Sequence, residues 1–305
     1  MSTQSFLSRV RVWIETARPA TLPLSFAAIL TGSALAAWRG GFSWSITLLA
    51  LLTASSLQIL SNFANDYGDA IKGSDGQERL GPLRGMQKGQ ITVQEMRKAL
   101  RICFACCIVI GSTLIWSACQ SVGDIIGFLF LGLLAIIAAI TYTIGKNPYG
   151  YLGLGDLSVL IFFGWLGVSG SYHLQTHAFD MSILLPATGC GLLATAVLNI
   201  NNLRDLDADQ KSGKRTLALR LGPLRARYYH IALLATAVIC LSFYALFELK
   251  SLTGWLFLLA TPLLAHQGWT VLHAPDGAAL RPLLKNALRG ALLTCTLFAA
   301  GTAMS

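Results

Sequence analysis

Residues 45–69, with the sequence SITLLALLTASSLQILSNFANDYGD, decide the fold because they join a long apolar run to a cluster of amides and carboxylates. A stretch of roughly 20 apolar residues is long enough to cross a bilayer as a helix. Backbone groups inside hydrocarbon must be satisfied within their own segment, which excludes an open strand. We therefore predict a membrane-spanning helix that carries polar residues at one end.

The overall composition is also that of a membrane protein. Of 305 residues, 54% are hydrophobic and 12% are Asp, Glu, Lys or Arg, whereas about 25% are charged in an average soluble domain. Mean hydropathy is +0.60. This balance excludes a disordered chain and a nucleic-acid-binding protein. The seven cysteines lie in apolar runs, which argues against a disulfide framework.

We predict an all-α protein in which residues 1–305 form a single membrane domain of nine transmembrane helices. No cleavable signal pattern precedes the first apolar run. The nine expected spans are 20–38, 45–63, 100–119, 124–143, 154–173, 181–200, 229–247, 252–272 and 286–304.

The distribution of lysine and arginine supports this count. With the N-terminus in the cytoplasm and the C-terminus outside, every lysine and arginine except Arg39 and Lys250 falls on the cytoplasmic side. Such an excess of cations in cytoplasmic segments is the usual signature of membrane orientation. The absence of a transit-peptide pattern favours the plasma (inner) membrane of a bacterium.

A first acidic motif follows the second span. At about 100° per residue, Asn62, Asp66 and Asp69 lie within about 60° of one another on a helix. Asn65 borders this stripe. The motif therefore predicts one polar face at the cytoplasmic end of the helix.

A second acidic motif follows the sixth span. If that helix continues, Asn201, Asp205 and Asp209 share one face, with Asn202 beside them and Asp207 pointing away. Both motifs lie in the two long cytoplasmic loops, and long loops in compact proteins are often functional.

These matching motifs suggest a magnesium site. Mg²⁺ is held in proteins by one or two carboxylates together with substrate phosphates and water. Two facing carboxylate pairs could hold Mg²⁺ ions around a diphosphate. The alternative is a pair of solvated helix ends neutralised by neighbouring cations. Two such motifs at matching positions favour the metal site, because carboxylates at a membrane edge are usually functional.

An internal repeat would bring the two motifs together. The segment LGPLR occurs at 80–84 and again at 221–225, at almost the same offset as the acidic motifs. This offset predicts that spans 1–4 match spans 5–8, related by a pseudo-twofold axis.

Cations follow the acids in both loops and are natural partners for diphosphate oxygens. Lys72, Arg79 and Arg84 follow the first motif, and Lys214 and Arg215 follow the second. The alternative for each is a cytoplasmic cation with no ligand. Tyrosines also lie near this edge, where aromatic residues are usually interfacial but could stabilise a carbocation; they are Tyr67, Tyr142, Tyr149 and Tyr151.

The two motifs resemble those of a known family. Asn65-Asp66-x-x-Asp69 after the second span, with Asp205-x-x-x-Asp209 after the sixth, is similar to the UbiA superfamily of intramembrane prenyltransferases. The resemblance covers nearly the whole chain, including nine helices with both motifs on the cytoplasmic side.

Longer stretches resemble one branch of that superfamily, the 1,4-dihydroxy-2-naphthoate polyprenyltransferases of menaquinone synthesis. These stretches are 65–89, 142–156 and 201–218. Gly73 stands where the superfamily often has a further aspartate. This departure fits the naphthoate branch and argues against the 4-hydroxybenzoate branch.

The resemblance implies a Mg²⁺-dependent transfer of a polyprenyl group from its diphosphate to the naphthoate ring, with loss of the acceptor carboxylate as CO₂. The isoprenoid donor and product both live in membrane lipid. The implied catalytic residues and metal ligands are Asp66, Asp69, Asp205 and Asp209. Our candidate substrate-binding residues are Asn62, Asn65, Lys72, Asp75, Arg79, Arg84, Lys146, Tyr149, Asn201, Asn202, Lys214 and Arg215.

Two other interpretations stay open at this point. A sibling aromatic prenyltransferase would use another acceptor, such as 4-hydroxybenzoate or a tetrapyrrole. An ion-coupled transporter would also carry paired acids in its membrane helices. Transport sites usually lie near the bilayer midplane, whereas these acids are predicted at the cytoplasmic edge, which favours the enzyme.

Overall fold

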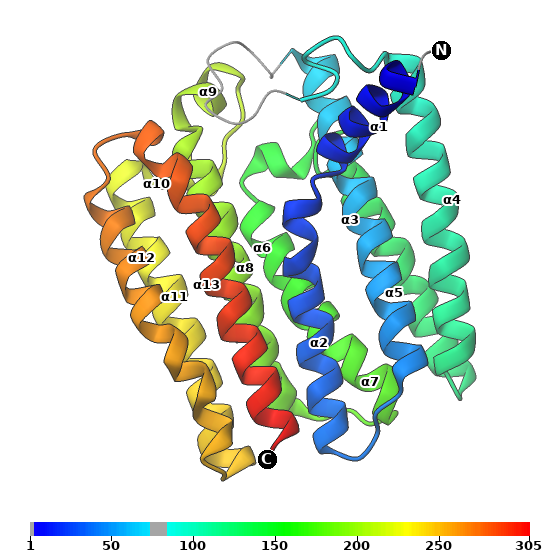
Figure 1. The fold of residues 1–305 in the computed structure, drawn as a ribbon, viewed down its shortest axis with the longest axis vertical. Coiled ribbons are helices and arrows are strands. Elements are labelled where there is room, and N and C mark those ends of the chain that lie inside the picture. The colour runs from blue at the N-terminus through cyan, green and yellow to red at the C-terminus, as the bar shows by residue number, and fades with distance from the viewer. Residues whose placement is uncertain (1–2, 74–83) are drawn as a thin grey trace.

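The computed structural model describes residues 3–73 and 84–305, with side chains from residue 8 onward. Every regular element in these ranges is helical, and none is a strand (Figure 1). The elements before the midpoint are α1 (Thr3–Ala17), η1 (Pro19–Thr21), α2 (Leu22–Trp38), α3 (Trp44–Lys72), α4 (Val93–Ala118), α5 (Val122–Thr141) and η2 (Tyr149–Leu152). The later elements are α6 (Gly155–Val159), η3 (Leu160–Gly170), α7 (Ser171–Thr176), η4 (Met181–Ile183), α8 (Leu184–Arg204), α9 (Leu206–Lys211), α10 (Leu217–Leu221), α11 (Pro223–Tyr244), η5 (Ala245–Leu249), η6 (Thr253–Ala260), α12 (Thr261–His273) and α13 (Gly277–Ala303).

Within the described residues, eight helical segments are long and apolar enough to cross a membrane. They overlap eight of the nine predicted spans. The remaining prediction, 252–272, falls on two consecutive helices, the 3₁₀ helix η6 and the α-helix α12. Pro262 lies in the first turn of α12 and has no backbone N–H to donate to the preceding turn, which accounts for the division.

The first predicted span is preceded by a separate helix. α1 ends at Ala17, and Arg18 adopts a left-handed conformation with φ of 54° before η1 and α2 begin. Such a conformation is uncommon for a residue with a side chain. It lets α1 leave the direction of α2 and lie across the end of the bundle (Figure 1).

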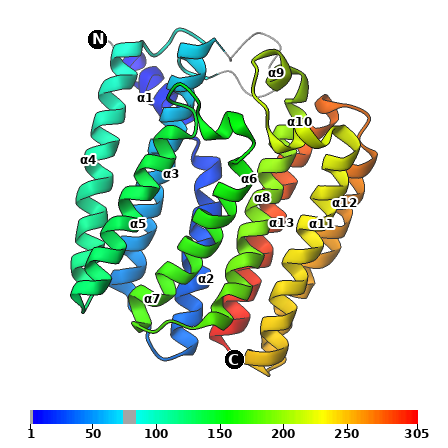
Figure 2. The ribbon, with the colours of Figure 1, turned by 180° about the vertical axis from the view of Figure 1, so that it is seen from behind.

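The bundle has two parts with a cavity between them. α3, α4 and α5 pack against one another, while α8 packs against η3, α11 and α13. Figure 2 shows α4 and α5 on one side of the molecule and α11 and α12 on the other. α2 joins the two parts because it packs against α3, η3 and α13.

The consecutive helical segments α6, η3 and α7 are held in place by a close backbone contact between η3 and α8. η3 is a π-helical stretch, a form often found at functional sites. A Cβ atom on Gly164 would lie 2.5 Å from the carbonyl oxygen of Ala187 and 2.9 Å from the Cα of Gly191 in α8. Only a glycine at this position lets η3 pack so closely on α8, and η3 supplies one wall of the cavity.

Gly164→Ala should destabilise the protein by about 1–3 kcal/mol, because the added methyl group overpacks the contact between η3 and α8. Gly127→Ala is the matched control, since a Cβ there meets nothing within 4 Å. Alanine favours a helix over glycine by about 0.5–1 kcal/mol, so the control should be neutral or slightly stabilising. Thermal unfolding in detergent measures both, and equal midpoints for the two variants would contradict the packing argument.

Candidate active site

A cavity of about 410 Å³ lies between the two parts of the bundle. Ala50 and Asp69 of α3 both line it, so at 1.5 Å per residue it extends about 28 Å along that helix. Its lining comes from α2, α3, α4, α5, η3, α7 and α8, among other segments. The cavity is therefore long enough to cross most of the bilayer core.

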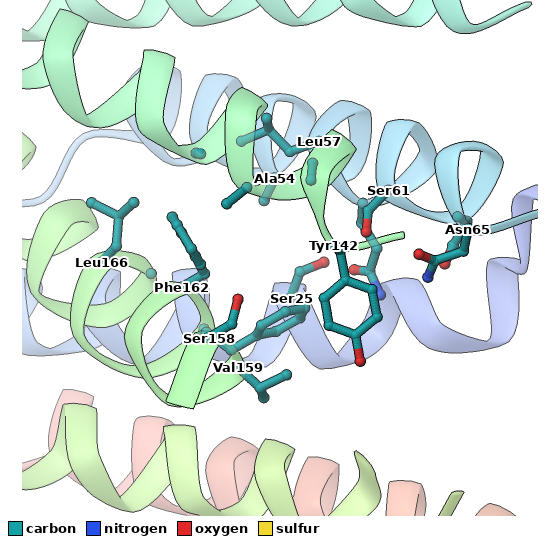
Figure 3. Close-up of a pocket in the computed structure, with 18 of the residues that line it drawn as sticks. Ser25, Ala54, Leu57, Ser61, Asn65, Tyr142, Ser158, Val159, Phe162 and Leu166 are labelled. Atoms are coloured by element: carbon teal, nitrogen blue, oxygen red, sulfur yellow. The ribbon is translucent and has the colours of Figure 1, made fainter. Parts of the chain in front are cut away.

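The lining changes from polar to apolar along the cavity. Figure 3 shows Ser61 and Asn65 toward one end and Phe162 and Leu166 toward the other, with Tyr142 between them. The lining residues that carry a charge or an amide near the polar end are Arg18, Asn62, Asn65, Asp69, Arg84, Asn201, Asn202, Asp205, Asp209 and Lys214.

The carboxylates of the first motif share one arginine. Asp66 is fully buried, and its Oδ1 is 2.7 Å from Nη2 of Arg18 and 3.2 Å from Nε of Arg84. Nη1 of Arg84 is 2.6 Å from Oδ2 of Asp69. Asp69 lines the cavity, whereas Asp66 lies behind it against the two guanidinium groups. The two aspartates of the predicted stripe therefore belong to one charge-paired cluster.

The amides of the first motif hold neighbouring backbone and side chains. Asn62 donates from Nδ2 to the carbonyl oxygen of Ala17 at 2.9 Å, which ties α3 to the end of α1. Asn65 accepts a hydrogen bond from Thr143. A Cβ atom on Gly68 would lie 2.9 Å from the carbonyl oxygen of Thr143, so this glycine lets the turn after α5 reach the motif.

The second motif lies at a break between α8 and α9. We expected one continuous helix, but α8 ends at Arg204 and Asp205 has φ of −101° and ψ of 17°. Arg204 binds the carboxylate of Asp205 through Nε at 2.9 Å and Nη2 at 2.5 Å. On a regular helix, the side chains of adjacent residues do not face each other. Arg204 and Asp205 are adjacent and paired, and the pairing occurs where Asp205 leaves helical geometry.

Asp209 nevertheless stays on the cavity side. Its backbone N–H donates to the carbonyl oxygen of Asp205 at 2.8 Å, and both residues line the cavity. Nζ of Lys214 is 3.8 Å from Oδ1 of Asp209. The shared face predicted for Asp205 and Asp209 is thus retained across the break, while Asp207 is exposed as predicted.

Two tyrosines at the cavity wall remain neutral. Tyr142 and Tyr149 meet edge to face, with ring centroids 5.3 Å apart. Burial raises the pKa of both phenols above the usual range. Tyr149 and nearby aspartate carboxylates raise the pKa of Tyr142 further. The hydroxyl of Tyr149 donates to the carbonyl oxygen of Ala138 at 2.9 Å. These groups therefore serve as walls and hydrogen-bond partners rather than as bases.

The other predicted residues lie at the rim or beyond it. Nζ of Lys72 lies 4.4 Å from the ring centroid of Tyr151. Lys146 and Arg215 are exposed and are not among the cavity-lining residues. Asp75 and Arg79 fall outside the described residues.

Sequence reasoning missed three residues that complete this end of the cavity. The sequence pattern indicates Arg18 and Arg204 only as cytoplasmic cations, and Tyr151 only as an aromatic residue near the membrane edge. The hydroxyl of Tyr151 donates to Oδ1 of Asp69 at 2.9 Å. Arg204 could have been suspected from its position beside Asp205, whereas the contact of Arg18 with Asp66 depends on how α1 folds back.

The donor set at the polar end fits magnesium by its chemistry. Carboxylate and amide oxygens are the hard ligands that Mg²⁺ prefers. Over residues 8–73 and 84–305, however, no three His, Cys, Asp or Glu side chains gather closely enough to hold a metal ion. The carboxylates instead contact cations, so metal binding would need these pairs to separate.

Comparison with known sequences identifies a protein family that matches most of this chain. Residues 25–294 match the UbiA prenyltransferase family. The chain is 57% identical to a 1,4-dihydroxy-2-naphthoate octaprenyltransferase of Escherichia coli K12 over 303 residues, covering 99% of this chain and 98% of the relative. It is 52% identical to a 1,4-dihydroxy-2-naphthoate octaprenyltransferase of Haemophilus influenzae, covering 96% of each.

The fold is that of solved family members. A UbiA homolog from Archaeoglobus fulgidus bound to GPP and Mg²⁺ superposes with a TM-score of 0.59 at 15% sequence identity, covering 94% of this chain and 99% of that one. A UbiA homolog from Aeropyrum pernix K1 gives a TM-score of 0.64 at 18% identity, covering 93% and 97%. Motifs, fold and relatives agree, and the chain belongs to the UbiA prenyltransferase family.

Proposed function

We propose that this protein transfers a polyprenyl group from polyprenyl diphosphate to 1,4-dihydroxy-2-naphthoate, releasing CO₂ and giving demethylmenaquinol in menaquinone synthesis. The observation that carries the proposal is a cavity with charged groups at one end and a mainly apolar trough along the rest. Relatives at 57% and 52% identity are named 1,4-dihydroxy-2-naphthoate octaprenyltransferases.

The charged end suits the diphosphate of the donor. Arg18, Arg84 and Lys214 line it and provide three cations, which are the natural partners of phosphate oxygens. Each contacts a carboxylate of the two motifs. A diphosphate would compete for these cations and free carboxylate oxygens for a metal.

Magnesium would be held by Asp69, Asp205 and Asp209 at the cavity and by Asp66 behind them. A bound Mg²⁺ would supply positive charge that neutralises the diphosphate leaving group as its bond to the prenyl carbon breaks. The A. fulgidus homolog of the same fold, solved with GPP and Mg²⁺, supports the use of this metal. The protein's own cations would stabilise the same developing charge from fixed positions.

The apolar part of the cavity suits the isoprenoid tail. Small residues from several helices leave room along it, including Ala54, Gly111 and Gly132. Tyr142 stands at the wall between the charged end and the trough, and Phe162 lines the trough farther along (Figure 3). Aromatic faces can stabilise an allylic cation, and an apolar surrounding excludes the water that would capture it.

Overall, the reaction needs no net proton transfer. The donor loses its bond between the prenyl carbon and the diphosphate oxygen, and the ring gains a carbon–carbon bond. The ring also loses its bond to the carboxylate, whose electron pair stays with the ring as CO₂ leaves. A sibling acceptor such as 4-hydroxybenzoate would release a ring proton instead, so CO₂ release separates the two acceptors.

The placement of charge does not favour an ion-coupled transporter. Such sites usually lie near the bilayer midplane. Among the described residues that line the cavity, the charged ones gather at one end: Arg18, Asp69, Arg84, Asp205, Asp209 and Lys214.

We also propose nine crossings of a bacterial plasma membrane, with the acidic motifs on the cytoplasmic side. Residues 253–273 are helical throughout, in two parts that together are long enough for a ninth crossing. α1 lies at one end of the bundle and the C-terminal end of α13 at the other (Figure 1), as an odd number of crossings requires. The cation distribution supports the orientation.

Asp205→Asn should lower the rate of Mg²⁺-dependent turnover by about 100-fold or more, because a metal ligand and its charge are lost. Asp207→Asn is the matched control, since Asp207 is exposed and two residues away. Turnover is measured in lipid across a series of Mg²⁺ concentrations. Similar losses in both variants, or a rate without Mg²⁺ equal to the rate with it, would contradict the assigned site.

Gly132→Leu should select against long donors, because the new side chain would enter the apolar trough. A Cβ at Gly132 meets nothing within 4 Å, so the fold should tolerate it. We expect the preference for a long polyprenyl over a geranyl diphosphate, measured as a ratio of kcat/KM, to fall about tenfold. Gly127→Leu, on the same helix and outside the cavity lining, should leave the ratio unchanged. An unchanged ratio in Gly132→Leu would show that the isoprenoid tail of the donor does not lie in this part of the trough.

A further inference from the structure

Tyr151 contacts the first acidic motif and the segment that follows the second one, from a short turn that carries neither motif. It lies in η2, between α5 and α6, and its side chain is half-buried. Its hydroxyl donates to Oδ1 of Asp69 in the first motif at 2.9 Å. Its carbonyl oxygen accepts from the backbone N–H of Arg215, after the second motif, at 3.0 Å. One residue thus joins the two segments through side chain and main chain.

Two lysines from different segments also lie beside the Tyr151 ring. Nζ of Lys72, at the end of α3, is 4.4 Å from the ring centroid, and Nζ of Lys214 is 5.6 Å from it. Both distances are within the range of a cation–π interaction. A free lysine side chain loses considerable rotamer entropy when it is ordered. If the Tyr151 ring already holds the lysine ammonium group in place, less rotamer entropy is lost when a ligand binds to that lysine.

We propose that Tyr151 is a positioning residue that orients Asp69 through its hydroxyl and holds Lys72 and Lys214 toward the diphosphate through its ring. This inference rests on the proposed function only for the identity of the donor as a prenyl diphosphate. Tyr151 is not among the cavity-lining residues, so it acts through its neighbours and does not touch the substrate.

The two contacts of Tyr151 have separable consequences. The hydroxyl supports a carboxylate that would bind metal, and losing such a supporting group typically costs about 10–100-fold in metal affinity. The ring supports two cations that would bind phosphate without metal. Tyr151→Phe removes only the hydroxyl, whereas Tyr151→Leu removes both contacts.

The test measures binding rather than turnover. Wild-type protein, Tyr151→Phe and Tyr151→Leu in lipid nanodiscs are titrated calorimetrically with geranyl thiolodiphosphate, a donor analogue that does not react. Each titration is run without Mg²⁺ and at several Mg²⁺ concentrations, with no acceptor present. Tyr228→Leu is the control, because Tyr228 is 57% exposed on α11 and does not line the cavity.

Tyr151→Phe should keep the Mg²⁺-free affinity within about twofold, since cation–π contacts do not need the hydroxyl. The Mg²⁺ concentration that gives half-maximal enhancement of binding should rise about tenfold. Tyr151→Leu should show that rise and also lose about tenfold in Mg²⁺-free affinity. Tyr228→Leu should bind as the wild type does.

Several results would overturn the proposal. One is wild-type binding by Tyr151→Leu at every Mg²⁺ concentration. Another is an equal loss of Mg²⁺-free affinity in Tyr151→Phe, which keeps the ring, and Tyr151→Leu, which lacks it. The ring would then contribute nothing to Mg²⁺-free binding. If Tyr151→Leu does not fold, an unchanged Mg²⁺ response in a normally folded Tyr151→Phe would still reject the role of the hydroxyl. Since no acceptor is present, failure of naphthoate turnover would leave this result intact.

Discussion

The pairing of carboxylates with cations at one end of the bundle is the interaction on which the rest of the structure depends. Asp66 has no exposed surface, and a buried carboxylate is costly unless it is paired and hydrogen-bonded. Arg18 and Arg84 supply that pairing. Because Arg18 comes from the turn after α1 and Arg84 from the described segment before α4, these contacts tie both segments to α3 at the charged end of the cavity.

This charge-paired cluster also prepares the protein for a diphosphate. The cations that neutralise the carboxylates in the described structure are of the type that binds phosphate oxygens, and the carboxylates are of the type that binds Mg²⁺. A magnesium diphosphate carries both kinds of charge, so it can replace each internal partner with an external one. The long apolar trough beyond the cluster then explains why the site lies within a membrane bundle, where an isoprenoid tail already resides.

Local patterns predicted the helices well and the long-range contacts poorly. Apolar runs and the spacing of Asn62, Asp66 and Asp69 depend on neighbours within one helix. The structure keeps all three residues on α3 and brings Asp66 and Asp69 into one charge-paired cluster. The break at Asp205 was not predicted, because its pairing with Arg204 competes with a helix that sequence pattern alone favours. The roles of Arg18 and Tyr151 depend on how distant segments meet, which no local pattern reports. The internal repeat stays a prediction.

The most direct test of the central claim is to count both products of one reaction. Wild-type protein in proteoliposomes would receive polyprenyl diphosphate, Mg²⁺ and 1,4-dihydroxy-2-naphthoate labelled in its carboxyl group. We predict one labelled CO₂ for each prenylated ring formed. A prenylated product that keeps its carboxyl label would contradict it. So would folded protein that ignores the naphthoate but prenylates 4-hydroxybenzoate.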